Sequence, residues 1–395
     1  APMASAVPAD RPPNLIWVMA DDLGWGDLGS YGQEVILTPE LDRMADEGLR
    51  FTQYYAGATV CAPSRSVLIT GQHHGRTRVR GNAGRNRSLA IQALQPGDPS
   101  VASVLKEAGY RTALVGKWGL GDVGEAEMGL PSNHGFDEFF GYLNQRHAHN
   151  HFTDFLWRND EKIRLPNTVV PVGGDSGAGY STDQVLFTGD LFADEALKFV
   201  SKNQDRPFFL YWSMVVPHAN NERTRELGDG ANVPDYGPYE TKDWPDPDKG
   251  QAAMITRLDS YVGRLMDHLK ILGIEDNTLV IFTSDNGPHD ESNHNLDRFD
   301  PNGPFSGKKR NKQKTHEFMY WEFPHWKGFV QAALYEGRWK GFRRGGPDAP
   351  VTLYDLDNDP AEKNDVSSQY PEIAEKIGSY LKLARKPAEN WPVTW

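Results

Sequence analysis

The sequence has very little cysteine, because its 395 residues include only Cys61. A single cysteine excludes an internal disulfide, and it excludes a zinc site built from several thiolates. If this thiol has a role, it acts alone. Long apolar runs are also missing, since no stretch approaches the roughly 18–20 residues that a helix needs to span a bilayer. The sequence therefore predicts a chain without a membrane span.

Positive charge is in the minority. Lys and Arg together number 42 against 54 for Asp and Glu, which gives a formal net charge of −12. This balance argues against general binding to nucleic acids or to acidic membrane surfaces. Residues 1–13 are small, polar and rich in proline, and they lack the charged segment and apolar core of a signal peptide. They could be the remnant of a cleaved leader or an engineered scar.

Short apolar segments alternate with amphipathic ones along most of the chain. The predicted strands are residues 14–20, 49–55, 111–116, 208–214 and 278–284. The predicted helices are residues 38–48, 64–70, 100–108, 190–203 and 249–272. This order indicates an α/β fold in which a large, mostly parallel sheet is covered by helices on both faces.

The pattern changes from about His316. Short antiparallel strands are predicted at 335–342 and 351–354, followed by a terminal helix at 371–384. We therefore predict a large N-terminal domain over residues 14–315 and a small C-terminal α+β subdomain over 316–395. Residues 220–250, which are polar and contain Gly and Pro, are predicted to form a long surface loop.

Two polar pairs directly follow predicted strands: Asp21-Asp22 follows the first, and Asp285-Asn286 follows the last. Ligands bind beyond the carboxyl ends of parallel strands, so we expect the two pairs to lie together. Three carboxylates and an amide oxygen, without thiolate or imidazole, suit Ca²⁺, with Mg²⁺ as the second choice. The alternative is that Asp-Asp caps a helix or turn and that Asp-Asn-Gly is a simple turn.

The surroundings of Cys61 are distinctive, because it begins the sequence Cys-Ala-Pro-Ser-Arg and Thr70-Gly71 follows shortly after. This pattern resembles the signature of the type I formylglycine-dependent sulfatases, a family of the alkaline phosphatase superfamily. Other family motifs occur in the expected order: Asp21-Asp22-Leu23-Gly24, Gly116-Lys117-Trp118, Pro217-His218, Ser284-Asp285-Asn286-Gly287, and Leu353-Tyr354-Asp355-Leu356 with Asp359-Pro360. The resemblance covers nearly the whole chain.

The resemblance implies an alkaline-phosphatase-like fold and an enzyme that hydrolyses sulfate esters. It also implies that a formylglycine-generating enzyme converts Cys61 to an aldehyde, formylglycine. A hydrated aldehyde has two hydroxyls, so one can attack sulfur and the other can later expel sulfate, which a plain Ser or Cys cannot do. The alternative for Cys61 is a small buried apolar side chain, which is the usual fate of a free cysteine.

Further site residues follow from the resemblance. It places Arg65 and Lys117 against the aldehyde hydrate, and it makes His218 a contact of the sulfate that can protonate the leaving alcohol. Lys309 matches the family's later lysine, which binds the sulfate group. A transition state with two negative charges needs fixed cations in a dry cleft. The alternatives are a solvated basic loop over 308–314 and a loop histidine bonded to backbone.

The sequence departs from the family at Gly119, where the family has a histidine after Gly-Lys-Trp. That histidine is thought to help collapse the sulfated hydrate. We therefore hypothesise that His147 or His149 enters the pocket and takes over this role. The alternative is that the two form an exposed cluster that contacts substrate or has no role.

A second departure follows Lys309-Arg310, where the family continues with another strand and helix of the sheet. Here the segment that begins at His316 follows almost at once, although in the family it lies well downstream. Either a segment near 310–316 is deleted, which would leave a sheet edge bare. Or residues that belong there are missing from the given sequence, and the numbering runs on across the gap. We favour the second, because loss of a central α/β element should be severely destabilising.

The expected substrate is a sulfated carbohydrate or another sulfated small molecule, bound at a rim that includes Arg80, His147 and His149. The chain resembles bacterial arylsulfatases and carbohydrate sulfatases, so a periplasmic or secreted location is expected. Two rival functions are open. One is a phosphonate or phosphate monoester hydrolase of the same superfamily, and the other is a catalytically silent protein that binds sulfated glycans.

Overall fold

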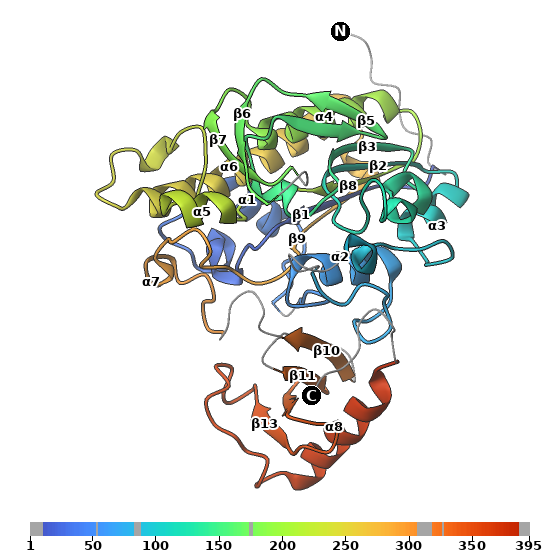
Figure 1. Cartoon of the computed structure of the whole chain (residues 1–395), viewed down its shortest axis with the longest axis vertical. Coiled ribbons are helices and arrows are strands. Elements are labelled where there is room, and N and C mark those ends of the chain that lie inside the picture. Colours follow the sequence, from blue (N-terminus) through green and yellow to red (C-terminus); the bar gives the residue numbers. More distant parts are fainter. Residues whose placement is uncertain are drawn as a thin grey trace.

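The computed structural model describes residues 11–52, 54–82, 88–173, 177–305, 318–325 and 328–386. Its main sheet has the strand order β5-β4-β3-β2-β8-β1-β9 (Figure 1). These strands are β1 (Asn14–Ala20), β2 (Arg111–Lys117), β3 (Glu138–Tyr142), β4 (Phe155–Arg158), β5 (Glu161–Arg164), β8 (Phe208–Ser213) and β9 (Thr278–Ser284). Neighbouring strands in the order β3-β2-β8-β1-β9 are parallel. In contrast, β4 is antiparallel to both β3 and β5.

Alternate residues of the central strands enter two hydrophobic layers. In β1, Ile16 and Val18 join one cluster of buried side chains, whereas Met19 joins the other. In β8, Trp212 and Tyr211 divide in the same way. Successive strand residues point to opposite faces, so a sheet that is covered on both faces needs an almost continuous apolar run in each central strand.

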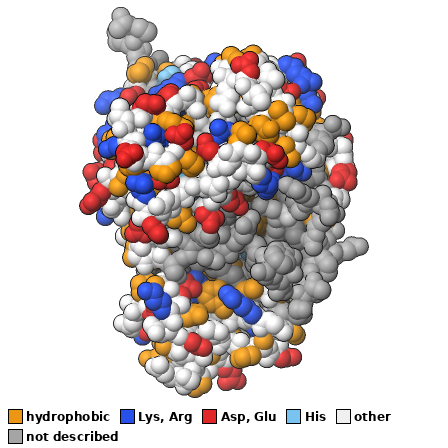
Figure 2. All heavy atoms as spheres, turned by 60° about the vertical axis from the view of Figure 1, so that its left-hand side comes forward, with side chains coloured by type: hydrophobic (Ala, Val, Ile, Leu, Met, Phe, Trp, Pro, Cys, Tyr) orange, Lys and Arg blue, Asp and Glu red, His pale blue; other side chains and the backbone are white. Residues whose placement is uncertain are grey.

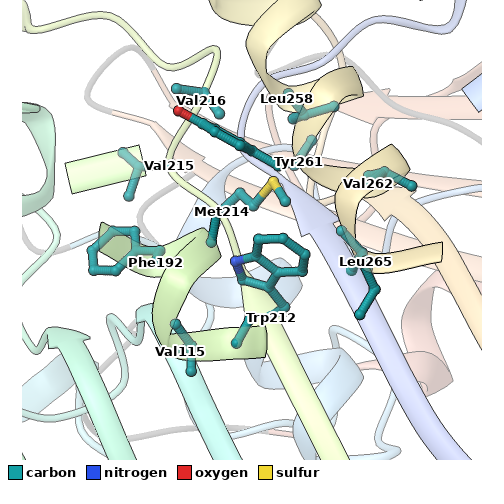
Figure 3. Close-up of a cluster of buried hydrophobic side chains, with 14 of the residues drawn as sticks. Val115, Phe192, Trp212, Met214, Val215, Val216, Leu258, Tyr261, Val262 and Leu265 are labelled. Atoms are coloured by element: carbon teal, nitrogen blue, oxygen red, sulfur yellow. The ribbon is translucent and has the colours of Figure 1, made fainter. Parts of the chain in front are cut away.

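Helices cover both faces of this sheet. The first layer is closed by α1 (Pro39–Glu47), α4 (Thr188–Asn203) and α6 (Asp246–Leu272). The second is closed by α2 (Cys61–Thr70) and α3 (Val101–Glu107). Figure 3 shows the first layer, where Trp212 of β8 lies among Phe192 of α4, Leu265 of α6 and Val115 of β2.

Smaller elements surround the sheet. A second pair of strands, β6 (Thr168–Pro171) and β7 (Gly179–Asp183), is antiparallel, and two short helices are α5 (Asn221–Leu227) and α7 (Leu296–Phe299). Single 3-10 turns occur at Trp25–Asp27, Gly29–Tyr31, Leu89–Gln92, Glu127–Gly129, Pro131–His134, His147–His149, Gly237–Tyr239 and Glu275–Asn277.

The C-terminal part has its own antiparallel sheet in the order β10-β11-β12-β13. The strands are β10 (Phe318–His325), β11 (Gly328–Tyr335), β12 (Trp339–Arg344) and β13 (Val351–Asp355), and α8 (Pro371–Ala384) packs against them. Ile377 and Leu381 of α8 share a separate hydrophobic cluster with Leu353 of β13. In Figure 1 this unit lies below the main sheet.

The predicted fold class is confirmed: the chain has a mostly parallel sheet between helices and a small antiparallel C-terminal sheet. Among the described residues of the predicted strand 49–55, none is in a strand. Leu49 and Phe51 are 88% and 60% exposed, so their alternation does not reflect a buried face. The predicted strand 335–342 spans the turn between β11 and β12, where Gly337 has a φ of 73°.

Two further predictions need correction. The helix that was expected over 64–70 begins three residues earlier, at Cys61. The expected loop over 220–250 contains α5 and the first turn of α6. Asn220 caps α5, because its side chain accepts a hydrogen bond from the backbone N–H of Arg223.

The predicted domain boundary at 315/316 and the expected gap near 310–316 lie outside the described residues. Both stay predictions. Within the described ranges, β9 pairs with β1 alone and forms one edge of the main sheet, and its Leu279 is 52% exposed.

Charge and hydrophobicity are spread over the surface. Figure 2 shows one face on which basic and acidic side chains are interspersed over the main body. Of the helices in the described ranges, none combines the length and apolar character that crossing a membrane requires.

We expect Leu265→Ala to lower the free energy of unfolding by about 2–5 kcal/mol, because it removes a fully buried side chain from the first layer. Urea denaturation followed by circular dichroism measures this change. The control is Leu383→Ala on α8, where the side chain is 77% exposed and the expected effect is within about 0.5 kcal/mol. Equal effects would contradict the packing described for this layer.

Candidate active site

The candidate active site begins where β1 and β9 end. Ala20 pairs with Ser284 in register, so Asp21 and Asp285 leave adjacent strands side by side. The backbone N–H of Asp22 donates a hydrogen bond of 3.1 Å to Oδ1 of Asp285. The expectation that the two polar pairs lie together is confirmed, because parallel strands bring their carboxyl ends to one edge.

Asn286 completes this group of acceptors. Its Nδ2 donates to Oδ1 of Asp22 at 2.6 Å and to the carbonyl oxygen of Gly287 at 3.0 Å. Its Oδ1 is buried and, among the described residues, accepts no hydrogen bond. A buried acceptor without a partner is costly, so this oxygen is placed for a ligand such as a cation.

The cluster combines buried carboxylates with buried cations. Asp21, Asp22 and Asp285 are fully buried, and two buried cations contact them. Arg65 donates to Oδ2 of Asp285 from Nη2 at 2.8 Å and from Nε at 3.1 Å, and the Lys117 ammonium bonds to Oδ2 of Asp21. Three carboxylates and the amide oxygen of Asn286 therefore lie together in one buried cluster. These hard oxygen ligands fit a divalent cation.

The pKa values of Asp285 and Lys117 are shifted by burial and by the neighbouring charges. Burial and the neighbouring charge of Asp21 raise the pKa of Asp285 above its ordinary value. Burial alone would lower the pKa of Lys117, but the charges of Asp21 and Cys61 raise it, so the ammonium stays charged. The cluster therefore favours bound positive charge.

Cys61 faces this cluster from the other side. It is the first residue of α2, is 1% exposed, and donates from Sγ to Oδ1 of Asp21 at 3.2 Å. Arg65 lies four residues further along the same helix, which places it on the same face. Ligand atoms of Asp21, Asp22, Cys61 and His218 all lie within 4.8 Å of one another.

His218 approaches from the segment after β8. Its Nδ1 lies 2.7 Å from the carbonyl oxygen of Ala219, which can only accept, so Nδ1 carries the proton. Its Nε2 then faces Asp22, with 3.4 Å between Nε2 and Oδ2. Of the predicted residues, the structure thus brings together Asp21, Asp22, Asp285, Asn286, Cys61, Arg65, Lys117 and His218.

His149 reaches this group and His147 does not. The ring of His149 stacks on that of His218, with centroids 4.8 Å apart and planes 13° apart. His147 is instead buried beside Phe155, and its Nε2 lies 2.7 Å from Oγ1 of Thr153. Both lie in one 3-10 turn, where side chains two residues apart point in different directions. The hypothesis that a histidine enters the pocket therefore applies to His149 alone.

Arg80 makes its contacts away from this cluster. Arg80 is 3% exposed, donates to the carbonyl oxygen of Lys386 at 2.7 Å and lies 3.7 Å from Glu322 of β10. It thus connects the segment after α2 with the C-terminal sheet, and its contacts do not place it on a substrate rim. Lys309 lies outside the described residues.

Gly119, where the family motif has a histidine, lies so close to Gln145 that a side chain here would require Gln145 to shift. Its φ is +78°, and a Cβ there would lie 2.2 Å from Nε2 of Gln145. Gln145 is 8% exposed, and its Nε2 has no hydrogen-bond partner among the described residues. The segment just before the turn that carries His149 therefore supplies the side chain that fills the space beside Gly119.

Three neighbours of the site are not among the residues predicted from the sequence. Ser213, at the end of β8, donates from its hydroxyl to the carbonyl oxygen of Lys117 at 2.6 Å and also contacts Arg65. Gln145 and Glu222 are the others. Only Glu222 had a signal, since it follows Pro217-His218 by a few residues and falls in the first turn of α5.

Comparison with known proteins agrees with this geometry. The family model described as Sulfatase matches residues 13–324. N-acetylgalactosamine-6-sulfatase of Rattus norvegicus is 36% identical over 303 residues, which cover 71% of this chain and 51% of the relative. Arylsulfatase A of Homo sapiens is 33% identical over 311 residues, which cover 72% of this chain and 54% of the relative. The chain thus spans about half the length of these curated relatives.

A solved structure extends the likeness in fold. The crystal structure of Ps i-CgsB in complex with k-i-k-neocarrahexaose has a TM-score of 0.74 and 21% identity, and the match covers 97% of this chain and 94% of that one. The chain belongs to the sulfatase family, whose model matches residues 13–324.

We expect Gly119→Ala to destabilise the chain more than Gly71→Ala does. Both glycines have positive φ, which costs roughly 1–2 kcal/mol for another residue. Only at Gly119 would the new Cβ also meet a neighbour, since nothing described lies within 4 Å of the corresponding position at Gly71. A double-mutant cycle with Gln145→Ala, measured by urea denaturation, should recover the excess cost. An equal cost at both glycines would refute the steric role of Gln145.

Proposed function

We propose that this chain is a sulfatase that hydrolyses sulfate esters and releases inorganic sulfate. The observation that carries the proposal is the position of Cys61, whose Sγ lies 3.2 Å from Asp21 within a buried cluster of carboxylates and cations. Because an inert cysteine needs no such neighbours, this placement favours a reactive residue. Membership of the sulfatase family supports the same activity.

The proposal includes maturation of Cys61 to formylglycine by a formylglycine-generating enzyme. The hydrated aldehyde would supply the attacking hydroxyl and a second hydroxyl for the release of sulfate. Cys61 begins α2, so its side chain is held at a helix N-terminus, which favours negative charge on an attacking group. Arg65 and Lys117 place two positive charges beside this position, because both stay charged although they are fully buried.

The four acceptor residues Asp21, Asp22, Asp285 and Asn286 would hold a divalent cation. Ca²⁺ is our first choice and Mg²⁺ the second, because all four donate hard oxygen ligands. A bound cation would supply charge stabilisation for a sulfate oxygen and for a deprotonated hydroxyl. His218, with its Nε2 directed at this cluster, would contact the sulfate group.

A sulfated carbohydrate is the substrate class that we propose. The relative from Rattus norvegicus is named for N-acetylgalactosamine 6-sulfate, and Ps i-CgsB was solved with a bound neocarrahexaose. Arg146 and Arg225 offer cations near His149, with side chains that are 22% and 52% exposed. Exposed cations at the entrance of a site favour binding of an anionic sugar. We further propose that the protein acts in the periplasm or is secreted.

We expect the chain, produced together with a formylglycine-generating enzyme, to release sulfate from 4-nitrophenyl sulfate. Cys61→Ala should reduce turnover to background, because the attacking group is lost. Parallel assays with a 4-nitrophenyl phosphonate test the rival hydrolase, and a faster rate on the phosphonate would overturn the sulfatase proposal. Absence of turnover on both esters, with retained binding of sulfated glycans, would instead favour the catalytically silent binding protein.

We expect Ca²⁺ to stabilise the chain, because it would bind the buried carboxylates and the Asn286 oxygen in the folded state only. The expected gain is about 2.7 kcal/mol at a calcium concentration of one hundred times Kd. Thermal unfolding with calcium and with excess EGTA measures it, and magnesium provides the comparison. Asp285→Asn should remove the gain, whereas Asp267→Asn, at a side chain that is 69% exposed, should keep it. An unchanged calcium response in Asp285→Asn would contradict the site.

A further inference from the structure

Glu222 is a buried carboxylate beside the candidate active site. It lies in α5, is 2% exposed, and its Oε2 accepts a hydrogen bond of 2.8 Å from Nδ1 of His149. Its Oε1 lies 3.3 Å from Arg225 and 3.6 Å from Arg146. Burial alone would raise the pKa of Glu222, but the hydrogen bond from His149 and the nearby positive charges lower it to about 2.

This contact determines the proton positions on His149. An ionised carboxylate can only accept, so Nδ1 of His149 keeps its proton. Nε2 is then the nitrogen that can donate or receive a proton, and among the described residues it has no hydrogen-bond partner. A histidine whose second nitrogen is oriented by a carboxylate is typical of proton transfer in active sites.

His149 also differs from the other histidines of its segment. His147 and His151 are fully buried, and their Nε2 atoms are bound to Thr153 and to the carbonyl oxygen of His218. The side chain of His149 is 14% exposed, so a ligand can reach it. Its stacking on His218 keeps it next to the residues that face the sulfate group.

We propose that His149 is a catalytic proton donor and that Glu222 is the positioning residue that orients it. The assignment rests on the proposed hydrolysis of sulfate esters. When the bond between sulfur and the alcohol oxygen breaks, its electron pair stays on that oxygen. The Nε2 proton of His149 moves to this oxygen, which leaves neutral His149 with its remaining proton on Nδ1. Glu222 holds the Nδ1 side of the ring, so Nε2 is the nitrogen that transfers the proton.

The two stacked histidines differ in their contacts, so we assign them different roles. His218 has Nδ1 on the Ala219 carbonyl and Nε2 towards Asp22, which places it on the side of the carboxylate cluster. His149 approaches the same place from the 147–149 turn with its Nε2 available. We therefore assign protonation of the leaving alcohol to His149, in place of His218, for which the family resemblance implied it. His218 keeps the proposed contact with the sulfate group.

The test compares an aryl sulfate with a good leaving group, 4-nitrophenyl sulfate, and one with a poor leaving group, phenyl sulfate. Formylglycine-containing full-length chain is assayed as wild type, His149→Gln and Glu222→Gln. Loss of a proton donor costs about 10²–10⁴-fold where the leaving group needs the proton. We expect His149→Gln to lower kcat on phenyl sulfate by about 10²-fold or more, with a much smaller loss on 4-nitrophenyl sulfate and little change in KM.

Glu222→Gln should show the same dependence on leaving group with a smaller loss. The matched control is Glu138→Gln, because Glu138 also pairs with two cations, Arg111 and Lys202, but lies at the opposite end of its strand. It should leave both rates unchanged. If Glu222→Gln does not fold, as judged by circular dichroism, His149→Gln alone decides the catalytic role.

Equal losses on the two esters in His149→Gln would overturn the proton-donor role, since a purely structural residue does not distinguish leaving groups. Normal rates in a folded Glu222→Gln would overturn its positioning role. Either result leaves the sulfatase proposal intact as long as the wild type releases sulfate and Cys61→Ala does not. If the wild type releases no sulfate from either ester, the proposed function fails, and this assignment fails with it.

Discussion

Three buried carboxylates set the central constraint on this molecule. Asp21, Asp22 and Asp285 are withdrawn from water at the ends of two adjacent strands, where their mutual repulsion would be costly if it stayed uncompensated. Arg65 pairs with Asp285 and Lys117 pairs with Asp21, so both cations are also buried. The orphaned oxygen of Asn286 marks the place where a further positive charge fits.

The direction of the central strands brings the residues of this cluster together. A parallel arrangement of β1, β8 and β9 is what brings Asp21, Asp285 and the segment of His218 to one edge. The helix α2 then begins at Cys61 and directs both its first residue and Arg65 at the same carboxylates. The two hydrophobic layers hold these elements rigidly, so the polar groups at the edge keep their mutual distances.

Local sequence predicted much of this arrangement. Continuous apolar runs identified the central strands, and the polar pairs at their ends indicated the site, because strand direction alone brings such ends together. Sequence could not separate His147 from His149, since their directions depend on the pitch of one 3-10 turn. Arg80 was misleading for a similar reason: cationic charge near a motif does not reveal whether the side chain faces a cleft or a neighbouring sheet. Glu222 follows Pro217-His218 closely in sequence, but its partner, His149, emerged only from the tertiary contact.

The central claim is that Cys61 is the precursor of the reactive group in this carboxylate and cation cluster. The most direct measurement is the mass of the tryptic peptide 51–65 from chain produced with a formylglycine-generating enzyme. The account predicts a peptide lighter by the difference between a thiol-bearing CH₂SH and an aldehyde CHO. A peptide found only with the intact thiol in such material would contradict it.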